Sequence, residues 1–194
     1  MSTDRQMRQR GLSLIELIVF IIIVSTALVG VLSVFNVAVR GSPDPMIRKQ
    51  MLAIAEALLE EVQLQPFTWC DPDDTLAATA GSAAGCTASY AEASGPETIA
   101  AVVETRDGAA TPFDNVNDYA GLALASPIAS LGAAGSAPAG YSATIAVTSQ
   151  ALNGVGDGTA SSASLLISVT VSHAGVDDLT LEGYRTRHSP NQLP

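Results

Sequence analysis

The feature that most constrains this chain is an apolar run near its N-terminus. Residues 17–39 include no ionisable side chain, and a helix over this run rises about 35 Å. That length is enough to cross the hydrocarbon core of a bilayer, which is about 30 Å thick. Arg5, Arg8 and Arg10 precede the run, and such positive charges stay on the cytoplasmic side. We therefore expect a single-pass membrane anchor whose C-terminal part is exported.

The composition and charge of the 194-residue chain exclude several classes of protein. Apolar residues make up 47% and charged residues 14%, so the chain is too hydrophobic to be disordered throughout, and one modest domain is expected. Beyond residue 11 there are 6 basic and 18 acidic side chains, a formal charge of −12, which argues against a nucleic-acid partner. The two histidines belong to no HExxH or GxSxG motif. We expect neither an enzyme nor a bound cofactor.

Glu16 stands at the start of the apolar run, where a carboxylate needs a partner. An ionisable group at the edge of a spanning helix costs about 2 to 3 kcal/mol unless it is compensated. Cleavage between Gly11 and Leu12 would create an α-amine four residues before Glu16, on the same helical face. That amine could pair with Glu16 of its own chain or of a neighbouring helix, which would set the register between subunits. The alternative is a simple anchor in which Gly11 and Glu16 have no special role.

An ordinary secretory signal is a second alternative for this N-terminus. Ser25, Thr26 and Ala27 are small residues of the kind that a signal peptidase accepts, and cleavage there would leave a chain that begins at Leu28. However, the apolar run continues for a dozen residues after Ala27, and a glutamate such as Glu16 is unusual in the apolar region of a signal. Both observations favour a retained helix.

Residues 10–21, with the sequence RGLSLIELIVFI, resemble the class III signal of type IV pilins and pseudopilins. The resemblance implies a cytoplasmic prepilin leader at residues 1–11, cleavage by a prepilin peptidase between Gly11 and Leu12, and methylation of the new N-terminal Leu12. It also implies that Glu16 aligns an incoming subunit with the previous one. Leu12 stands where the family usually has Phe or Met.

The same resemblance implies partners and a location. The partners would be a prepilin peptidase, other major and minor pilins, and an inner-membrane assembly platform. Residues 12–40 would cross the bacterial inner membrane as the transmembrane and assembly helix. The N-terminus would be cytoplasmic and the C-terminal domain periplasmic, until the subunit enters a pilus fibre.

A second, amphipathic helix is expected within residues 41–65, after a break at Pro43 and Pro45. Each proline restricts the residue before it and removes a backbone donor, while Asp44 and Pro45 suit an N-cap and a first helical position. Pro66 ends the pattern. An apolar stripe with a period of 3.6 residues predicts packing on the soluble sheet, or against other helices in a filament. The stripe consists of Ile47, Met51, Ile54, Ala55, Leu58 and Val62.

Further stretches narrow the resemblance to the minor pilins of mannose-sensitive haemagglutinin (MSHA) pili. These stretches, called the family segments below, are residues 44–63, 66–74, 114–119 and 181–187. The resemblance implies a minor type IV pilin that is incorporated into a pilus or primes its assembly. A type II secretion pseudopilin would use the same anchor, and an adhesive or ligand-binding pilus-tip module is the alternative from another class.

Residues 66–194 are expected to form the periplasmic globular domain. Between residues 75 and 164, 56 of the 90 residues are Ala, Gly, Ser or Thr. Such residues bury little apolar area, so long loops and short strands are expected. Low-complexity linkers are the alternative at 77–84 and 133–139.

Alternating apolar residues predict the strands of an antiparallel sheet. The predicted strands are residues 99–105, 141–148, 165–172 and 179–187. The turn-rich residues 173–178 would join the last two strands in a hairpin. A long, proline-interrupted N-terminal helix packed on a small antiparallel sheet is an α+β architecture of the pilin type.

The only two cysteines, Cys70 and Cys86, enclose 15 residues. They lie in a part of the chain that is expected outside the cytoplasm, where disulfides persist. We therefore predict a disulfide between them, worth about 3 kcal/mol for a loop of this size. A redox or zinc site is the alternative, but it lacks a CxxC spacing and nearby histidines.

Asp114, Asn115, Asn117 and Asp118 form a cluster of oxygen-bearing side chains of the kind that binds calcium. Their spacing does not match an EF-hand loop, and Asx residues also build turns by bonding to their own backbone. These four residues are therefore weak calcium candidates, and a structural turn is their expected role. For similar reasons we expect a solvated loop at residues 71–74.

Overall fold

The computed structural model describes residues 13–40, 45–131, 136–156, 158–159, 163–189 and 191. The chain forms two compact units, Met1–Pro43 and Asp44–Pro194. Gly11 and Leu12, at the predicted cleavage point, and the predicted helix cap Asp44 lie outside the described residues.

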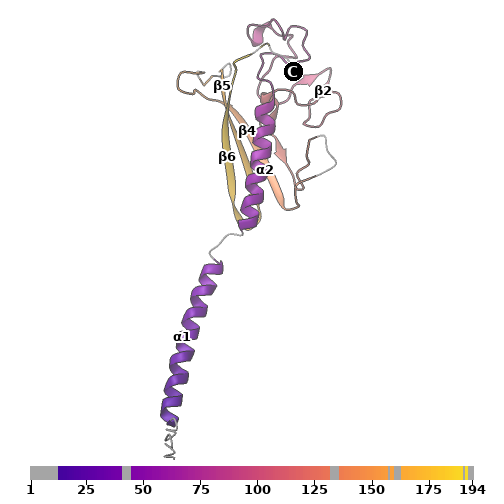
Figure 1. Cartoon of the computed structure of the whole chain (residues 1–194). Helices are drawn as coiled ribbons and strands as arrows, with labels where there is room; N and C mark the ends of the chain where they lie inside the picture. Colours follow the sequence, from indigo (N-terminus) through magenta and orange to yellow (C-terminus); the bar gives the residue numbers. More distant parts are fainter. Residues whose placement is uncertain are drawn as a thin grey trace, which may run out of the picture. The chain divides into compact units, whose positions relative to one another are not determined.

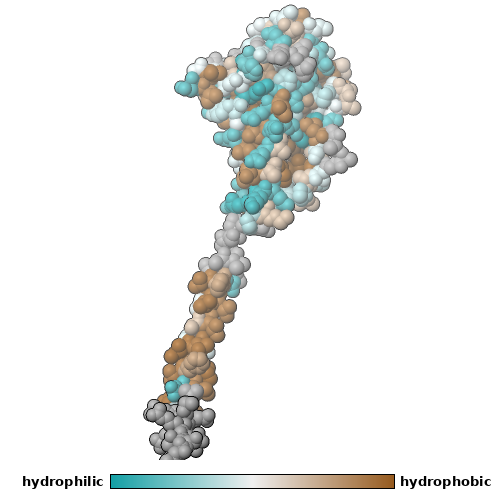
Figure 2. Space-filling model, in the orientation of Figure 1, coloured by the Kyte–Doolittle hydropathy of each residue, from teal (hydrophilic) through white to brown (hydrophobic). Residues whose placement is uncertain are grey.

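The described part of the first unit is the helix α1, Leu14–Arg40 (Figure 1). Side chains 13–36 are all exposed, and Figure 2 shows a largely hydrophobic surface along this helix. Hydroxyl groups within it bond to the preceding turn, as Ser25 Oγ does to Ile21 O at 2.7 Å, which lowers the cost of placing them in lipid. Leu14–Asn36 is long and apolar enough to cross a membrane. The predicted apolar helix is therefore present, and its length and composition are compatible with a membrane anchor.

The second unit begins with α2, Pro45–Leu64. Proline is favoured at the first helical position because its missing N–H has no intrahelical partner there, so the helix restarts at Pro45 as predicted. The predicted apolar stripe is confirmed: four of its members are buried and Ile47 and Ile54 are partly buried against the same core. The buried members are Met51, Ala55, Leu58 and Val62.

Four antiparallel strands form the sheet on which α2 lies, in the order β3-β4-β5-β6 (Figure 1). Alternate residues of β4 face α2, so that Ile145 and Val147 are buried while Thr144 and Ala146 are exposed. A single core between helix and sheet results, and the α+β prediction is confirmed. The strands are β3 (Ala123–Leu124), β4 (Tyr141–Ser149), β5 (Ser164–His173) and β6 (Val176–Thr186).

The hairpin between β5 and β6 is tighter than the sequence predicts. His173 pairs with Val176, so only Ala174 and Gly175 form the turn, rather than residues 173–178. Gly175 has a φ of 84°, which glycine adopts without steric cost and which two-residue hairpin turns require. The last strand consequently starts three residues earlier than predicted.

The prediction of one strand at residues 99–105 is wrong. Two short strands, β1 (Thr98–Ile99) and β2 (Val102–Val103), pair with each other across a turn instead. Ala100 and Ala101 form that turn with φ values of 49° and 71°, a conformation that alanine rarely adopts. Alanine is not a residue typical of turns, so the apolar pattern gave no indication that the chain reverses direction here.

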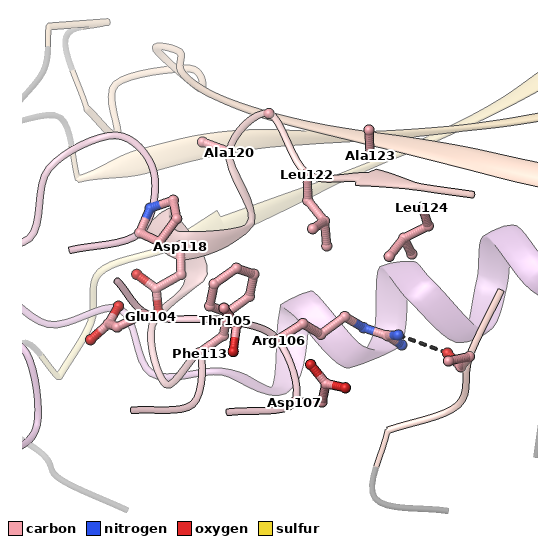
Figure 3. A pocket seen from close by; sticks show the side chains of 13 residues that line it. Glu104, Thr105, Arg106, Asp107, Phe113, Asp118, Ala120, Leu122, Ala123 and Leu124 are labelled. Atoms are coloured by element: carbon pink, nitrogen blue, oxygen red, sulfur yellow. Dashed lines mark hydrogen bonds between the residues drawn. The ribbon is translucent and has the colours of Figure 1, made fainter. Parts of the chain in front are cut away.

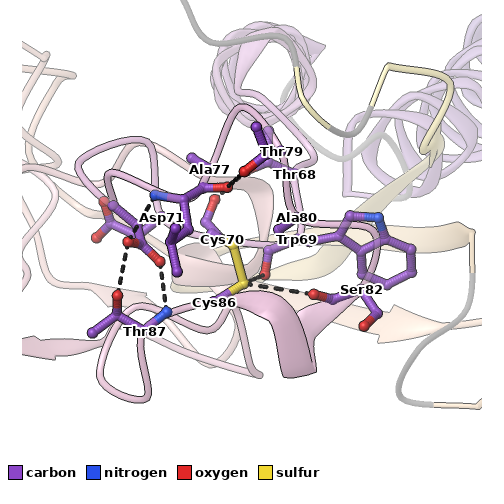
Figure 4. The surroundings of a disulfide bond; sticks show 12 residues. Thr68, Trp69, Cys70, Asp71, Ala77, Thr79, Ala80, Ser82, Cys86 and Thr87 are labelled. Carbon is purple, nitrogen blue, oxygen red and sulfur yellow. Dashed lines mark hydrogen bonds between the residues drawn. A yellow bond between two sulfur atoms is a disulfide. The ribbon is translucent and has the colours of Figure 1, made fainter.

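The predicted disulfide is confirmed. Cys70 and Cys86 are bonded, with their Cα atoms 5.5 Å apart (Figure 4). Ala77 and Ala80 are buried against the bond, and Asn191 Nδ2 donates to both of their carbonyl oxygens. Residues 77–84 are therefore a packed loop around the disulfide and not a linker.

Candidate functional site

Glu16 lies in the first turn of α1, with its side chain exposed. A carboxylate there is favoured by the positive end of the helix dipole. It is the only ionisable residue of Leu14–Asn36, so this stretch offers it no charged partner of its own. Any charged partner would therefore come from outside this stretch, and the expectation that Glu16 contacts an amine stays a prediction.

A second feature of the described residues is a collection of carboxylates in the loops between α2 and β3. Asp118 and Glu104 lie close together at one side of a cavity of about 470 Å³ (Figure 3). The loops that supply these groups come from four separate parts of the sequence and have hardly any regular structure of their own. The carboxylate cluster, as it is called below, consists of Asp71, Asp73, Glu92, Glu97, Glu104, Asp114 and Asp118.

Glu92, Glu97 and Asp118 form the centre of the carboxylate cluster. One oxygen from each lies within 4.8 Å of the other two. Asp118 is 1% exposed and Glu97 is 9% exposed. Within the described part of the chain, Glu92 Oε2, Glu97 Oε2 and Asp118 Oδ1 are buried and accept no hydrogen bond. Buried polar atoms are nearly always satisfied, so these three atoms need an explanation.

The short helix η2, Val116–Tyr119, positions Asp118. Its cap Asn115 accepts a hydrogen bond from Asn117 N, and Asp118 Oδ2 accepts one from Asn115 N at 2.8 Å and one from Asp114 N at 3.0 Å. This reciprocal arrangement is a capping box. The predicted turn at residues 114–118 is therefore present, and it holds one oxygen of Asp118 while it leaves the other free.

The two asparagines and the two aspartates among the four weak calcium candidates have different surroundings in the structure. Asn115 uses its amide to cap η2 and to donate to Thr68 Oγ1 at 2.8 Å, so its side chain serves the fold. Asp114 and Asp118 belong to the carboxylate cluster. Asn117 lines a cavity of about 600 Å³ beside Glu92.

The β1–β2 hairpin brings Glu97 and Glu104 together. Glu104 N donates to Glu97 O at 3.0 Å, and Glu97 N donates to Glu104 Oε2 at 3.3 Å. Glu97 Oε1 accepts a hydrogen bond from Ala93 N at 3.0 Å. The turn at Ala100 and Ala101 thus places both glutamates inside the domain. The sequence pattern did not predict this turn.

Burial and nearby negative charges raise the pKa values of Glu92, Asp118 and Glu104. Burial, followed by the negative charges of Asp118 and Glu97, raises the pKa of Glu92 to about 11. Burial, with added repulsion from Glu104 and Glu97, raises the pKa of Asp118 to about 9. Burial and the hydrogen bond to Asp71 raise the pKa of Glu104 to about 8. Carboxylates held this closely cannot all be ionised without a compensating charge.

The expectation of a solvated loop at residues 71–74 is wrong for two of its acids. Asp71 is 1% exposed, and its nearest oxygen lies within 4.8 Å of oxygens of Asp73 and Asp114. Asp74 is also buried, but its oxygens accept hydrogen bonds from Thr87 N at 2.7 Å and Thr87 Oγ1 at 2.9 Å. Beside the disulfide, Asp74 therefore holds the loop through its hydrogen bonds to Thr87. Asp71 instead belongs to the carboxylate cluster.

Arg187 is a cation close to Glu92. Its guanidinium carbon lies 3.9 Å from the ring centre of Phe67 and 3.8 Å from that of Trp69, and Arg187 and Glu92 line the same cavity. Burial lowers the pKa of Arg187 to about 10, although the charge of Glu92 opposes this shift. One guanidinium offsets only a small part of the negative charge that the cluster would carry if ionised.

Comparison with family models, with curated proteins and with solved structures finds no match to this chain. Its function must therefore be argued from its own residues and geometry.

Proposed function

We propose that this chain is a membrane-anchored filament subunit of the type IV pilin class. The observation that carries the proposal is the position of Glu16: one carboxylate at the start of a charge-free span, four residues after the expected new N-terminus at Leu12. The α+β domain with an amphipathic α2 on an antiparallel sheet supports it. In this proposal α1 spans the inner membrane and the domain of residues 66–194 is periplasmic.

Within that class, we propose an MSHA-type minor pilin similar to MshD. Support comes from where the family segments lie in the fold. Residues 114–119 build η2 and its cap, and Arg187, at the end of another family segment, stacks on Phe67 and Trp69 from a third. Three separated family segments therefore meet in one part of the domain.

The proposed mechanism is charge pairing followed by packing. A prepilin peptidase removes residues 1–11, and the resulting amine of Leu12 pairs with Glu16 of a neighbouring subunit. This ion pair stabilises the assembly more in lipid than it would in water, because an unpaired carboxylate in lipid is unfavourable in free energy. The apolar surface of α1 then packs against other pilins, and the assembly platform moves the subunit from the inner membrane into the fibre.

A type II secretion pseudopilin is the closest alternative, because it would use the same anchor for a short periplasmic filament. Gene neighbourhood separates the two: MSHA biogenesis genes beside this one support the pilus, and secretion genes support the pseudopilin. An adhesive pilus-tip module is the alternative from another class. It predicts that the subunit occurs only at fibre ends, where gold-labelled antibody would detect it.

The assembly role is tested by replacing Glu16 in the native host. Glu16→Gln keeps the size and removes the charge, and Asp178→Asn makes the same change at an exposed position of β6. We expect the Glu16→Gln chain to be cleaved and retained in the membrane but lost from sheared fibres, while Asp178→Asn is incorporated normally. Normal incorporation of both variants would contradict the assembly role of Glu16.

A further inference from the structure

The negative charge of three buried oxygens at the centre of the carboxylate cluster has to be neutralised. Among the residues that the structure describes, Glu92 Oε2, Glu97 Oε2 and Asp118 Oδ1 are buried and accept no hydrogen bond from outside the three acids, and one oxygen from each acid lies within 4.8 Å of one from each of the others. If all three were ionised and unpaired, their repulsion in a poorly solvated interior would oppose folding. Either protons or a cation must neutralise them.

We infer that Glu92, Glu97 and Asp118 bind a calcium ion. The remaining oxygens of two of these acids are already held by the backbone, Glu97 Oε1 by Ala93 N and Asp118 Oδ2 by Asn115 N. Backbone hydrogen bonds thus hold one oxygen of Glu97 and one of Asp118 and leave Glu97 Oε2 and Asp118 Oδ1 without a backbone donor, in the way that outer hydrogen bonds fix metal ligands. A shared proton bridges two oxygens, whereas a cation contacts all three.

The ligand chemistry selects calcium among common metal ions. All three groups are carboxylates, and no histidine or cysteine belongs to this set, which favours a hard cation over zinc or copper. Oxygens on opposite sides of a calcium ion, each at about 2.4 Å, are about 4.8 Å apart. One oxygen from each acid lies within 4.8 Å of one from each of the others, which is compatible with a calcium sphere. Magnesium usually keeps several of its waters and is seldom bound in a cage made wholly of protein ligands, so three buried carboxylates favour calcium.

The surrounding charges also favour a divalent cation. Asp71, Glu104 and Asp114 add negative charge around the three ligands. The nearby cation Arg187 is stacked between two aromatic rings, and Arg106 is engaged by Glu61. A bound calcium ion would join residues 92–97 to η2 and so order the loops at this end of the domain.

The test is calcium titration of the full-length protein in detergent after removal of metal with EGTA. Isothermal calorimetry should give one calcium site in the wild type, and calcium should raise its melting temperature. Glu97→Gln and Glu92→Gln each remove one ligand charge without touching the η2 cap, and each should weaken calcium binding at least tenfold. Asp178→Asn, on the exposed face of β6, should bind as the wild type does.

Several results would overturn the calcium site. One is the absence of any calcium heat or melting shift in wild-type protein whose circular dichroism shows it to be folded. Another is an equal response of the wild type and both ligand variants, which would place the ion elsewhere. An equal response to magnesium and calcium would contradict the assignment of the site to calcium.

Discussion

Arg106 and Glu61 form a two-point ion pair that joins the loop after β2 to the helix α2. Arg106 Nε lies 2.7 Å from Glu61 Oε1, and Arg106 Nη2 lies 2.6 Å from Glu61 Oε2. Arg106 Nη1 also donates to Ala129 O at 2.7 Å, the contact drawn in Figure 3. Because Arg106 follows Glu104 by two residues, this pair fixes one side of the carboxylate cluster to the core helix.

Breaking this pair should destabilise the domain strongly. The two side chains are only 10% and 14% exposed, and removal of one partner of a buried pair costs about 3 to 5 kcal/mol. Arg106→Ala should therefore lower the free energy of unfolding by an amount near that range, as measured by urea denaturation. Arg48→Ala is the matched control, since Arg48 and Asp177 are 3.7 Å apart and their side chains are 42% and 97% exposed. It should cost less than about 1 kcal/mol, and equal losses would contradict the structural role of Arg106.

The disulfide should account for a large share of the stability of the loop region. Closing a loop of this size contributes about 3 kcal/mol, and Cys70 is fully buried. Dithiothreitol should lower the melting temperature of the wild type, and the double variant Cys70→Ser, Cys86→Ser should melt at a similarly low temperature with or without the reductant. A wild-type protein whose melting is insensitive to complete reduction would refute this assignment.

Gly183 on β6 allows the close approach of α2. A Cβ atom there would collide with Gln63 Nε2 and lie 3.2 Å from Leu59 Cδ1. Because these atoms are the ends of flexible side chains, which can move aside, Gly183→Val should destabilise the domain by about 1 kcal/mol, the lower end of the usual cost of overpacking. Gly81→Ala is the control, because a Cβ at Gly81 meets no atom within 4 Å. If chemical denaturation gives both variants wild-type stability, the helix does not pack on β6 as described.

Without calcium, the stability of the domain should fall as the pH rises from about 6 to 9. Glu104 and Asp118, with pKa values raised to about 8 and 9, retain protons in the folded state that the unfolded chain has already released. Such groups stabilise the fold at low pH and lose this contribution as the pH passes their folded pKa values. Ordinary surface carboxylates are fully ionised over this range.

Melting temperatures measured in EGTA across this pH range test the expectation. The wild type should lose stability steadily with rising pH, and Glu97→Gln should show a shallower slope because it removes one of the repelling charges. Saturating calcium should also reduce the slope. A calcium-free wild type whose stability increases between pH 6 and 9 would show that the cluster is ionised and compensated in another way.

Sequence patterns predicted those helices and strands that bury one face against the core. The stripe from Ile47 to Val62 and the alternation along β4 each record burial on one side, and the structure confirms both. The isolated cysteine pair was sufficient to predict its disulfide. The hairpin turn at Ala100 and Ala101 was missed, since alanine gives no local signal for positive φ.

The centre of the carboxylate cluster could not be predicted from spacing. Glu92 and Glu97 lie in the loop before β1, whereas Asp118 lies in η2. The hydrogen bond from Gly95 N to Asn117 O and the cap of η2 bring the two segments together. The sequence drew attention to residues 114–118 because their oxygen-bearing side chains are adjacent, yet Asn115 is used for capping. Adjacent oxygens were therefore a poor guide to the acids that converge in space.

The central claim, that this chain is a processed pilin-class subunit, is tested most directly by N-terminal mass analysis of the protein extracted from membranes of its native host. We expect a mature chain that begins with N-methylated Leu12 and lacks residues 1–11. A chain that begins at Leu28, or one that retains Met1 in the presence of an active prepilin peptidase, would contradict it.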